Sequence, residues 1–128
     1  MPPTFSDELL EFWRERHLCS VTTLRADGSP HVVPMGIVLD AEHGRAWGIT
    51  SRSSQKVANL QRGTDPRVAV NQVDGRRWST LQGTAEVRDD ADDVAEAVRR
   101  YTRRYRMPRE NPARVALRIS VTSVIGNV

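Results

Sequence analysis

Residues 18–39 read LCSVTTLRADGSPHVVPMGIVL. Two runs rich in β-branched residues, 18–25 and 31–39, flank the loop ADGSP. Its Asp27-Gly28 pair is typical of tight turns between antiparallel strands. The stretch therefore predicts a β-hairpin, and residues 67–73 and 76–88 around Asp74-Gly75 predict a second one.

Working outward, further strands are expected at 45–50 and 114–124, the latter with Val115, Leu117, Ile119 and Val121 facing inward in strict alternation. Helical spacing of apolar residues and capping signals predict helices at 7–16, at 54–62, and from the acidic cluster DDADD to before Pro108. The apolar face of the last helix is expected to hold Val94, Val98, Tyr101 and Tyr105.

This order of elements predicts a mainly β fold with peripheral helices. Short connections between strands favour a six-stranded antiparallel barrel over a parallel α/β sheet. With 128 residues, no repeats and no linker, the chain is expected to form one domain over 1–128.

Composition narrows the class of protein. The chain is 38% hydrophobic and 27% charged, as in ordinary globular proteins, and holds no apolar run of membrane-spanning length. Charged residues interrupt the N-terminal stretch where a signal peptide needs apolar ones, so a cytoplasmic protein is expected. Cys19 is the single cysteine, which excludes an internal disulfide. The strong preference for arginine indicates a GC-rich coding sequence, such as those of actinobacteria.

The net charge of +3 is mildly basic, yet only 5% of the residues are aromatic and no nucleic-acid-binding motif is present. A small anionic ligand explains this charge as well as a nucleic acid does. Nucleic-acid binding is therefore ranked last among the possible functions.

Residues 50–60, TSRSSQKVANL, hold the only lysine of the chain. The stretch is predicted to be the end of a strand followed by the start of a helix, where unpaired N–H groups and the helix dipole favour an anion. The hydroxyl groups of residues 50, 51, 53 and 54, together with Arg52 and Lys56, suit a phosphate. The alternative is that Ser53 only caps the helix and Lys56 is solvated.

The sequence shows no motif for nucleotide binding, for catalysis by side chains or for metal binding. The sequence has neither of the glycine-rich nucleotide-binding motifs, no serine–histidine–acid arrangement and no H-E-x-x-H, and its three histidines lack ligand spacing. No metal site is expected and no catalytic residue is assigned. An enzyme of this sequence would need a cofactor to carry the reaction.

Three runs together resemble one family: HLCSVTTLRADGSPHVVPM, ITSRSSQKVANLQRGTDPRVAV and VDGRRWSTLQGTAEV. They are similar to the pyridoxamine 5′-phosphate oxidase-like superfamily of split β-barrels, and most similar to its deazaflavin branch, the coenzyme F420-dependent oxidoreductases. The run RRYTRRYRMPRENPARV resembles the F420-dependent biliverdin reductases. The resemblance implies a flavin-mononucleotide-binding-like split barrel and a homodimer with two cofactor sites at the subunit interface.

The resemblance also implies site residues. The strand from His31 to Gly36 would run along the flavin-type ring. Thr50, Ser54 and Lys56 match the family's phosphate-binding positions, and a partner subunit would cover the cofactor near Trp78. The implied cofactor-binding set is His31, Val33, Pro34, Met35, Gly36, Thr50, Ser51, Ser54, Gln55, Lys56, Asn59 and Trp78.

Two positions depart from the flavin mononucleotide (FMN) oxidases of the superfamily. Gln55 stands where they usually carry an arginine, and Gly36 stands where they place a cofactor-contacting lysine. These differences favour F420 and keep FMN as the alternative cofactor. The arginines at 99–109 are candidates for the cofactor tail or for substrate carboxylates, or else form a solvated helix face.

The function predicted by this resemblance is hydride transfer from reduced F420 to a conjugated anionic acceptor, with biliverdin as the leading candidate. The alternatives are an FMN-dependent oxidoreductase of the same fold, or a protein that binds F420, a tetrapyrrole or a fatty acid without turnover.

Overall fold

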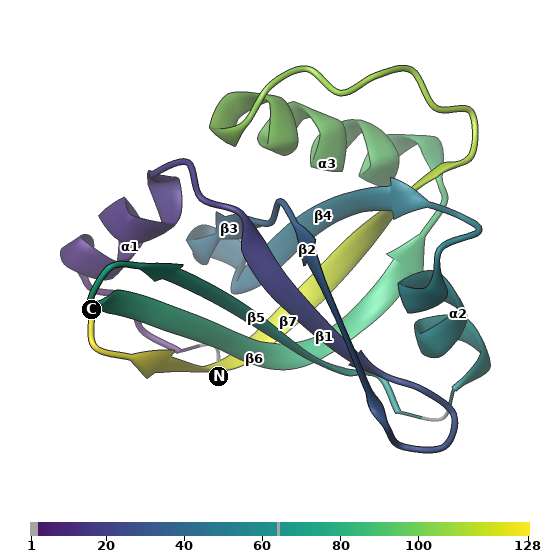
Figure 1. Ribbon diagram of the computed structural model, residues 1–128. Coiled ribbons are helices and arrows are strands. Elements are labelled where there is room, and N and C mark those ends of the chain that lie inside the picture. Colours follow the sequence, from purple (N-terminus) through teal and green to yellow (C-terminus); the bar gives the residue numbers. More distant parts are fainter. Residues whose placement is uncertain (1–2, 64) are drawn as a thin grey trace.

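The computed structural model describes residues 3–63 and 65–128. Seven strands form one antiparallel sheet in the order β2-β1-β5-β6-β7-β4-β3 (Figure 1). The strands are β1 (Cys19–Leu24), β2 (Pro30–Met35), β3 (Val38–Asp40), β4 (Arg45–Ser51), β5 (Arg67–Asp74), β6 (Arg77–Arg88) and β7 (Arg114–Gly126). The helices are α1 (Asp7–Arg14), α2 (Gln55–Arg62) and α3 (Ala91–Arg104), and a short 3-10 turn, η1 (Ala41–His43), precedes β4.

Both predicted hairpins are confirmed. β1 pairs with β2 and β5 pairs with β6, each around its Asp-Gly turn. Gly75 has a φ of +62°, a left-handed conformation that glycine adopts without steric cost. The alternation predicted for the last strand is also confirmed, because all four of its inward residues are buried.

The sheet has seven strands rather than the six expected, because the run 31–39 divides after Met35. Ile37 lies at the break, and its backbone groups form hydrogen bonds with side chains at the C-terminal end of α3. Its N–H donates to the Tyr105 hydroxyl at 3.2 Å, and its carbonyl accepts from the Arg104 guanidinium. Ile37 thus leaves the strand ladder, and β3 pairs with β4 on the other side of the sheet.

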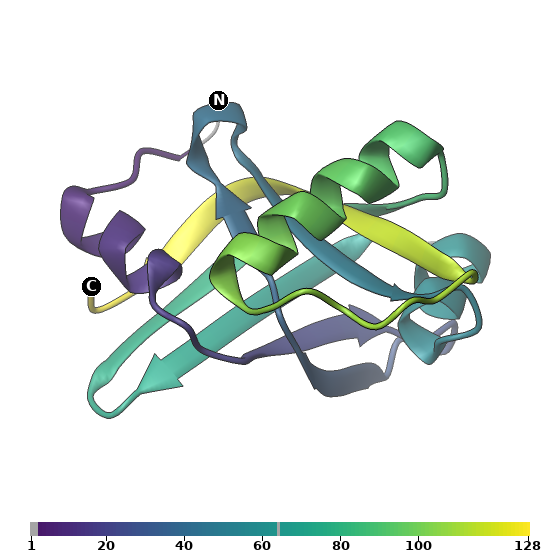
Figure 2. The same ribbon diagram turned by 90° about the horizontal axis from the view of Figure 1, so that it is seen from above.

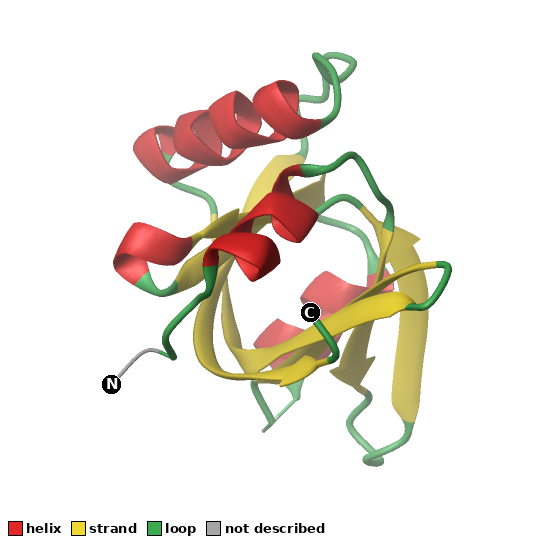
Figure 3. Cartoon of the chain, turned by 90° about the vertical axis from the view of Figure 1, so that its left-hand side faces the viewer, coloured by secondary structure: helices red, strands yellow, loops and turns green. Residues whose placement is uncertain are grey.

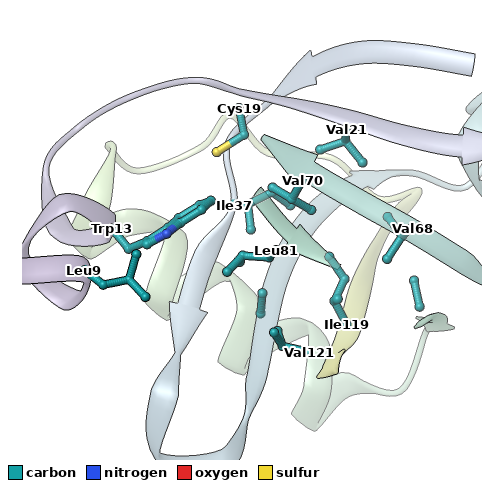
Figure 4. Close-up of a cluster of buried hydrophobic side chains, with 12 residues drawn as sticks. Leu9, Trp13, Cys19, Val21, Ile37, Val68, Val70, Leu81, Ile119 and Val121 are labelled. Carbon is teal, nitrogen blue, oxygen red and sulfur yellow. The ribbon is translucent and has the colours of Figure 1, made fainter. Parts of the chain in front are cut away.

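The sheet curls on itself and encloses the core (Figure 3). β2 and β3 are its two edges, and no pairing among the described residues joins them, so the curled sheet stays open there. The enclosed side chains come from six of the elements, including Val21, Leu81 and Ile119 (Figure 4). Leu9 and Trp13 of α1 close one end of this core, where the Trp13 indole N–H donates to Ser79 Oγ at 3.0 Å.

Helix α3 covers the outer side of β4 and β7, where Trp47, Ala97 and Ala116 are buried together (Figures 1 and 2). The prediction of the apolar face of this helix was partly wrong. Its buried residues are Ala97 and Arg104, while the four predicted residues are half-buried. A buried arginine does not register in an apolar periodicity, so the sequence pattern missed it.

Helices α1 and α2 lie at opposite ends of the sheet (Figures 1 and 2). Among the helices of residues 3–63 and 65–128, none combines the length and the apolarity needed to cross a membrane.

Candidate functional site

The junction of β4 and α2 forms a cluster of hydroxyl groups. Ser54 is the helix N-cap, and its Oγ accepts from the Val57 N–H at 3.4 Å and from the Thr50 hydroxyl at 3.3 Å. The Asn111 amide donates to Ser51 Oγ at 2.9 Å. The capping serine is therefore Ser54, not the Ser53 of the alternative reading, and capping accounts for only one member of the cluster.

Backbone donors at this junction have no partner in the chain. No acceptor among the described residues takes the N–H groups of Ser53, Gln55 or Lys56. Such groups at the start of a helix carry the positive end of its dipole. Such a group of unpaired donors is suited to an oxyanion.

Lys56 lies in the first turn of α2 and is half-buried. Within the described ranges, no carboxylate approaches its ammonium group to 4.0 Å. Burial lowers the pKa of Lys56, because desolvation disfavours the charged form. A bound anion would supply the missing counter-charge and reverse this shift.

His31 is the second residue of β2, opposite Thr23 of β1, and lies near enough to Lys56 for the lysine charge to act on it. Its Nδ1 is inaccessible to solvent and has no hydrogen-bond partner in the described part of the chain. Burial lowers the pKa of His31, and the nearby positive charges of Arg25 and Lys56 lower it further. An unsatisfied buried polar atom is uncommon and costs free energy, so this ring nitrogen is a candidate ligand contact.

β2 leads from His31 toward Gly36, a distance of about 16 Å at roughly 3.3 Å per residue. His31, Val33 and Met35 share the face of their partners in β1, which are buried, whereas Pro34 is exposed on the other face. Because β2 is an edge strand, one row of its backbone N–H and C=O groups is unpaired by the sheet. The start of this strand lies near the junction, because the charge of Lys56 acts on His31.

Gly36 directly follows β2 and is tightly packed. A Cβ atom on Gly36 would lie 2.7 Å from the Tyr105 ring and 2.9 Å from the Tyr101 ring. These rings pack against each other with centroids 5.0 Å apart. A side chain at Gly36, such as the lysine of the FMN oxidases, would therefore require the tyrosine rings to shift. Sequence reasoning placed both tyrosines on a core face and missed this contact.

Two predicted site residues are occupied by contacts within the chain. The Gln55 amide donates to Asn59 Oδ1 at 2.7 Å, and the Asn59 amide donates to Thr23 Oγ1 at 2.8 Å. Asn59 is only 3% exposed. This placement makes Asn59 the anchor of α2 on β1, while its contact with a cofactor stays a prediction.

Within one chain, the structure does not place Trp78 beside the residues of the β4–α2 junction and β2. Trp78 is the second residue of β6, opposite Val73, and its carbonyl accepts from the Asn127 N–H near the C-terminus. The start of β6 lies at the end of the sheet away from α2 (Figure 1). A contribution of Trp78 to the site requires a second copy of the chain, as the resemblance implied.

A group of possible metal ligands also comes together, at the surface. Oxygen and nitrogen atoms of Glu15, His17 and Asp74 lie within 4.8 Å of one another. The Arg77 guanidinium bonds to both carboxylates and occupies their acceptor positions. This arrangement is an ion-pair network and gives no reason to assign a metal.

A curled antiparallel sheet with hydroxyl groups and unpaired N–H groups at the β4–α2 junction defines the class. The chain belongs to the pyridoxamine 5′-phosphate oxidase family, whose model matches residues 5–127. It is 46% identical over 122 residues to the F420H2-dependent biliverdin reductase of Mycobacterium tuberculosis, covering 95% of this chain and 88% of that protein.

Solved structures show the same fold. A conserved hypothetical protein of Mycobacterium tuberculosis has a TM-score of 0.79 at 25% identity, covering 98% of this chain and 86% of its own. A structure described as an F420 reductase has a TM-score of 0.73 at 21% identity, covering 98% of each chain.

Proposed function

We propose that the protein is an F420-dependent oxidoreductase that reduces biliverdin. The observation that carries this proposal is the 46% identity to an F420H2-dependent biliverdin reductase over 95% of the chain. The geometry of the β4–α2 junction and the crowding at Gly36 support it independently.

The residues present fit F420. The unpaired N–H groups and hydroxyls at the start of α2, with the unpaired cation of Lys56, suit a phosphodiester. The buried Nδ1 of His31 offers a further contact beside them. The free edge of β2 offers backbone groups to a flat ring, beside the half-buried side chain of Val33, whereas Met35 packs against the core.

When bound, reduced F420 supplies the hydride. The protein's own contribution is alignment and electrostatics. Lys56 and the N-terminus of α2 neutralise the anionic end of the cofactor, and Gly36 keeps the strand free of a charged side chain. Tyr101 and Tyr105 hold that end of the strand in place through their contact with Gly36.

FMN is the second candidate cofactor, because the chain belongs to the pyridoxamine 5′-phosphate oxidase family, and the resemblance to that superfamily implied a site for a flavin-type ring. Two features weigh against it. Gln55 replaces an arginine and bonds to Asn59, so it adds no charge. A lysine in place of Gly36 would require the tyrosine rings to shift.

We further propose that the working form is a homodimer. The outer face of the sheet carries exposed Val32, Val73 and Ile125, which are 58%, 59% and 48% exposed. An open hollow of about 680 Å³ lies over β1, β5, β6 and β7 on the same face. A second copy seated there would bury these side chains and bring its own Trp78 toward the neighbouring subunit. We place this dimer in the cytoplasm, a compartment consistent with the buried free thiol of Cys19.

Paired titrations test the cofactor. F420 and FMN are each added to the purified protein, and binding is followed by quenching of tryptophan fluorescence. The proposal predicts a dissociation constant for F420 at least tenfold below that for FMN. The reverse preference would move the protein to the FMN-dependent branch.

A further inference from the structure

A cleft lies between α1, β3 and α3, at the end of the sheet away from α2. It consists of two adjoining hollows of about 380 and 340 Å³, which share Trp13, Arg14, Leu39, Arg100 and Arg103 in their walls. Its apolar surface comes from Leu10, Trp13, Val38 and Leu39. Such volumes lie at the lower end of the range for small-molecule sites.

Arg104 lines this cleft and is only 8% exposed. Its guanidinium bonds solely to neutral acceptors: the Glu15 carbonyl at 2.9 and 2.8 Å, the Gln72 amide oxygen at 2.7 Å and the Ile37 carbonyl. No carboxylate of the described residues lies within 4.0 Å of it. Buried charges in proteins are normally paired, so Arg104 lacks a counter-ion.

The four bonds also leave one proton of Arg104 without an acceptor. A guanidinium carries five N–H protons, and one of the two on Nη1 has no partner in the described part of the chain. Trp13 and Tyr105 lie against its faces, with ring centroids 5.4 and 5.2 Å from the central carbon. These contacts hold the cation in place but do not neutralise it.

The mouth of the cleft adds further positive charge. Arg103 is exposed, and no carboxylate in residues 3–63 and 65–128 lies within 4.0 Å of it. Arg14 contacts only Glu11, at 3.5 Å, with both side chains largely exposed.

Two carboxylates line the cleft as well. Asp40 is buried and already engaged by Arg100 at 3.4 Å and by His43 at 2.9 Å. Glu42 is exposed at the rim. Arg100 is also held by Glu96, at 2.7 Å. Glu42 makes no ion pair within the described residues either. The unpaired charges of the cleft are therefore two positive, Arg103 at the mouth and Arg104 inside, and one negative at the rim, so that their sum is positive.

We propose that this cleft binds a small apolar carboxylate, whose carboxyl group pairs with Arg103 and Arg104 and whose apolar part packs on Trp13 and Leu39. The inference goes beyond the proposed function, because it involves neither the β4–α2 junction nor β2. It assigns a ligand to the arginines at the end of α3, which the sequence left open between the cofactor tail, substrate carboxylates and a solvated helix face.

The test uses the isotope-labelled full chain without F420. 2-Naphthoate is titrated and the amide shifts are recorded, and 2-naphthylmethanol, its uncharged analogue, serves as the matched probe. We expect saturable shifts confined to α1, β3 and the second half of α3, and a dissociation constant at least tenfold lower for the carboxylate.

Arg103→Gln should weaken naphthoate binding about tenfold or more. Arg109→Gln is the control, because it removes the same charge from an exposed residue outside the cleft. Equal affinity for both probes, equal binding by the two variants, shifts that centre on α2, or the absence of saturation at millimolar naphthoate would each overturn the proposal. None of these outcomes depends on whether F420 is the cofactor.

Discussion

Replacing Lys56 by alanine is the most informative change to the site. Lys56 is the only lysine of the chain. It makes no ion pair within the described residues, and burial lowers its pKa. The fold therefore gains no ion-pair energy from its charge, so Lys56→Ala should leave the free energy of unfolding unchanged or slightly raised.

The expected loss of cofactor binding follows from the position of Lys56. Two unit charges 4 Å apart attract by about 1 kcal/mol in water and about 4 kcal/mol at the effective dielectric constant of a protein surface. A half-buried ammonium lies between these limits, and a charge-assisted hydrogen bond contributes about 1.5–3 kcal/mol. The dissociation constant for F420 should therefore rise roughly 10-fold to 150-fold.

Fluorescence titration of F420 against the wild type and the variant measures this change. Arg62→Ala is the control, since it removes a positive charge from the exposed last turn of the same helix. We expect the control to bind nearly as the wild type does. An unchanged dissociation constant for Lys56→Ala, or an equal loss in Arg62→Ala, would refute the assignment of the phosphate to the start of α2.

Three other changes test separate parts of the account. Gly36→Ala should lower the free energy of unfolding by about 1–3 kcal/mol in urea, because its Cβ would lie 2.7 Å from a tyrosine ring; an unaltered midpoint would contradict this crowding. Val73→Glu should convert the proposed dimer into monomers in sedimentation and abolish F420 binding, whereas a variant dimer that binds normally would exclude this face. Arg77 and His17 lower the pKa of Glu15 to about 2 from 4.5, so the ion pair stabilises the fold above pH 4.5 and is lost as the pH falls toward 2. The melting temperature of Glu15→Gln should accordingly lie below that of the wild type at pH 6 and match it near pH 2; a constant difference would be evidence against the pair.

Local sequence signals were enough to predict the parts of the fold that depend on nearby residues. The two Asp-Gly turns and the alternation from Val115 to Val121 each need only a few residues to define them. The hydroxyl cluster around Lys56 was likewise evident, because a helix start and its anion-binding groups are contiguous in the chain.

The features that were missed depend on residues far apart in the sequence. The strand breaks at Ile37 because Arg104 and Tyr105, more than sixty positions later, take its backbone hydrogen bonds. Similarly, Asn59 reads as a polar residue on a helix face, and only its contact with Thr23 shows that it is buried. No periodicity within one segment encodes such contacts.

Turnover tests the central claim most directly. Reduced F420 and biliverdin are mixed with catalytic amounts of the purified protein, and oxidised F420 and bilirubin are followed together by absorbance. The account predicts that both appear in equal amounts, only when protein and biliverdin are present, and more slowly with Lys56→Ala at subsaturating cofactor. Tight binding of reduced F420 without any oxidation by biliverdin would contradict it and leave a protein that binds the cofactor without carrying out this reaction.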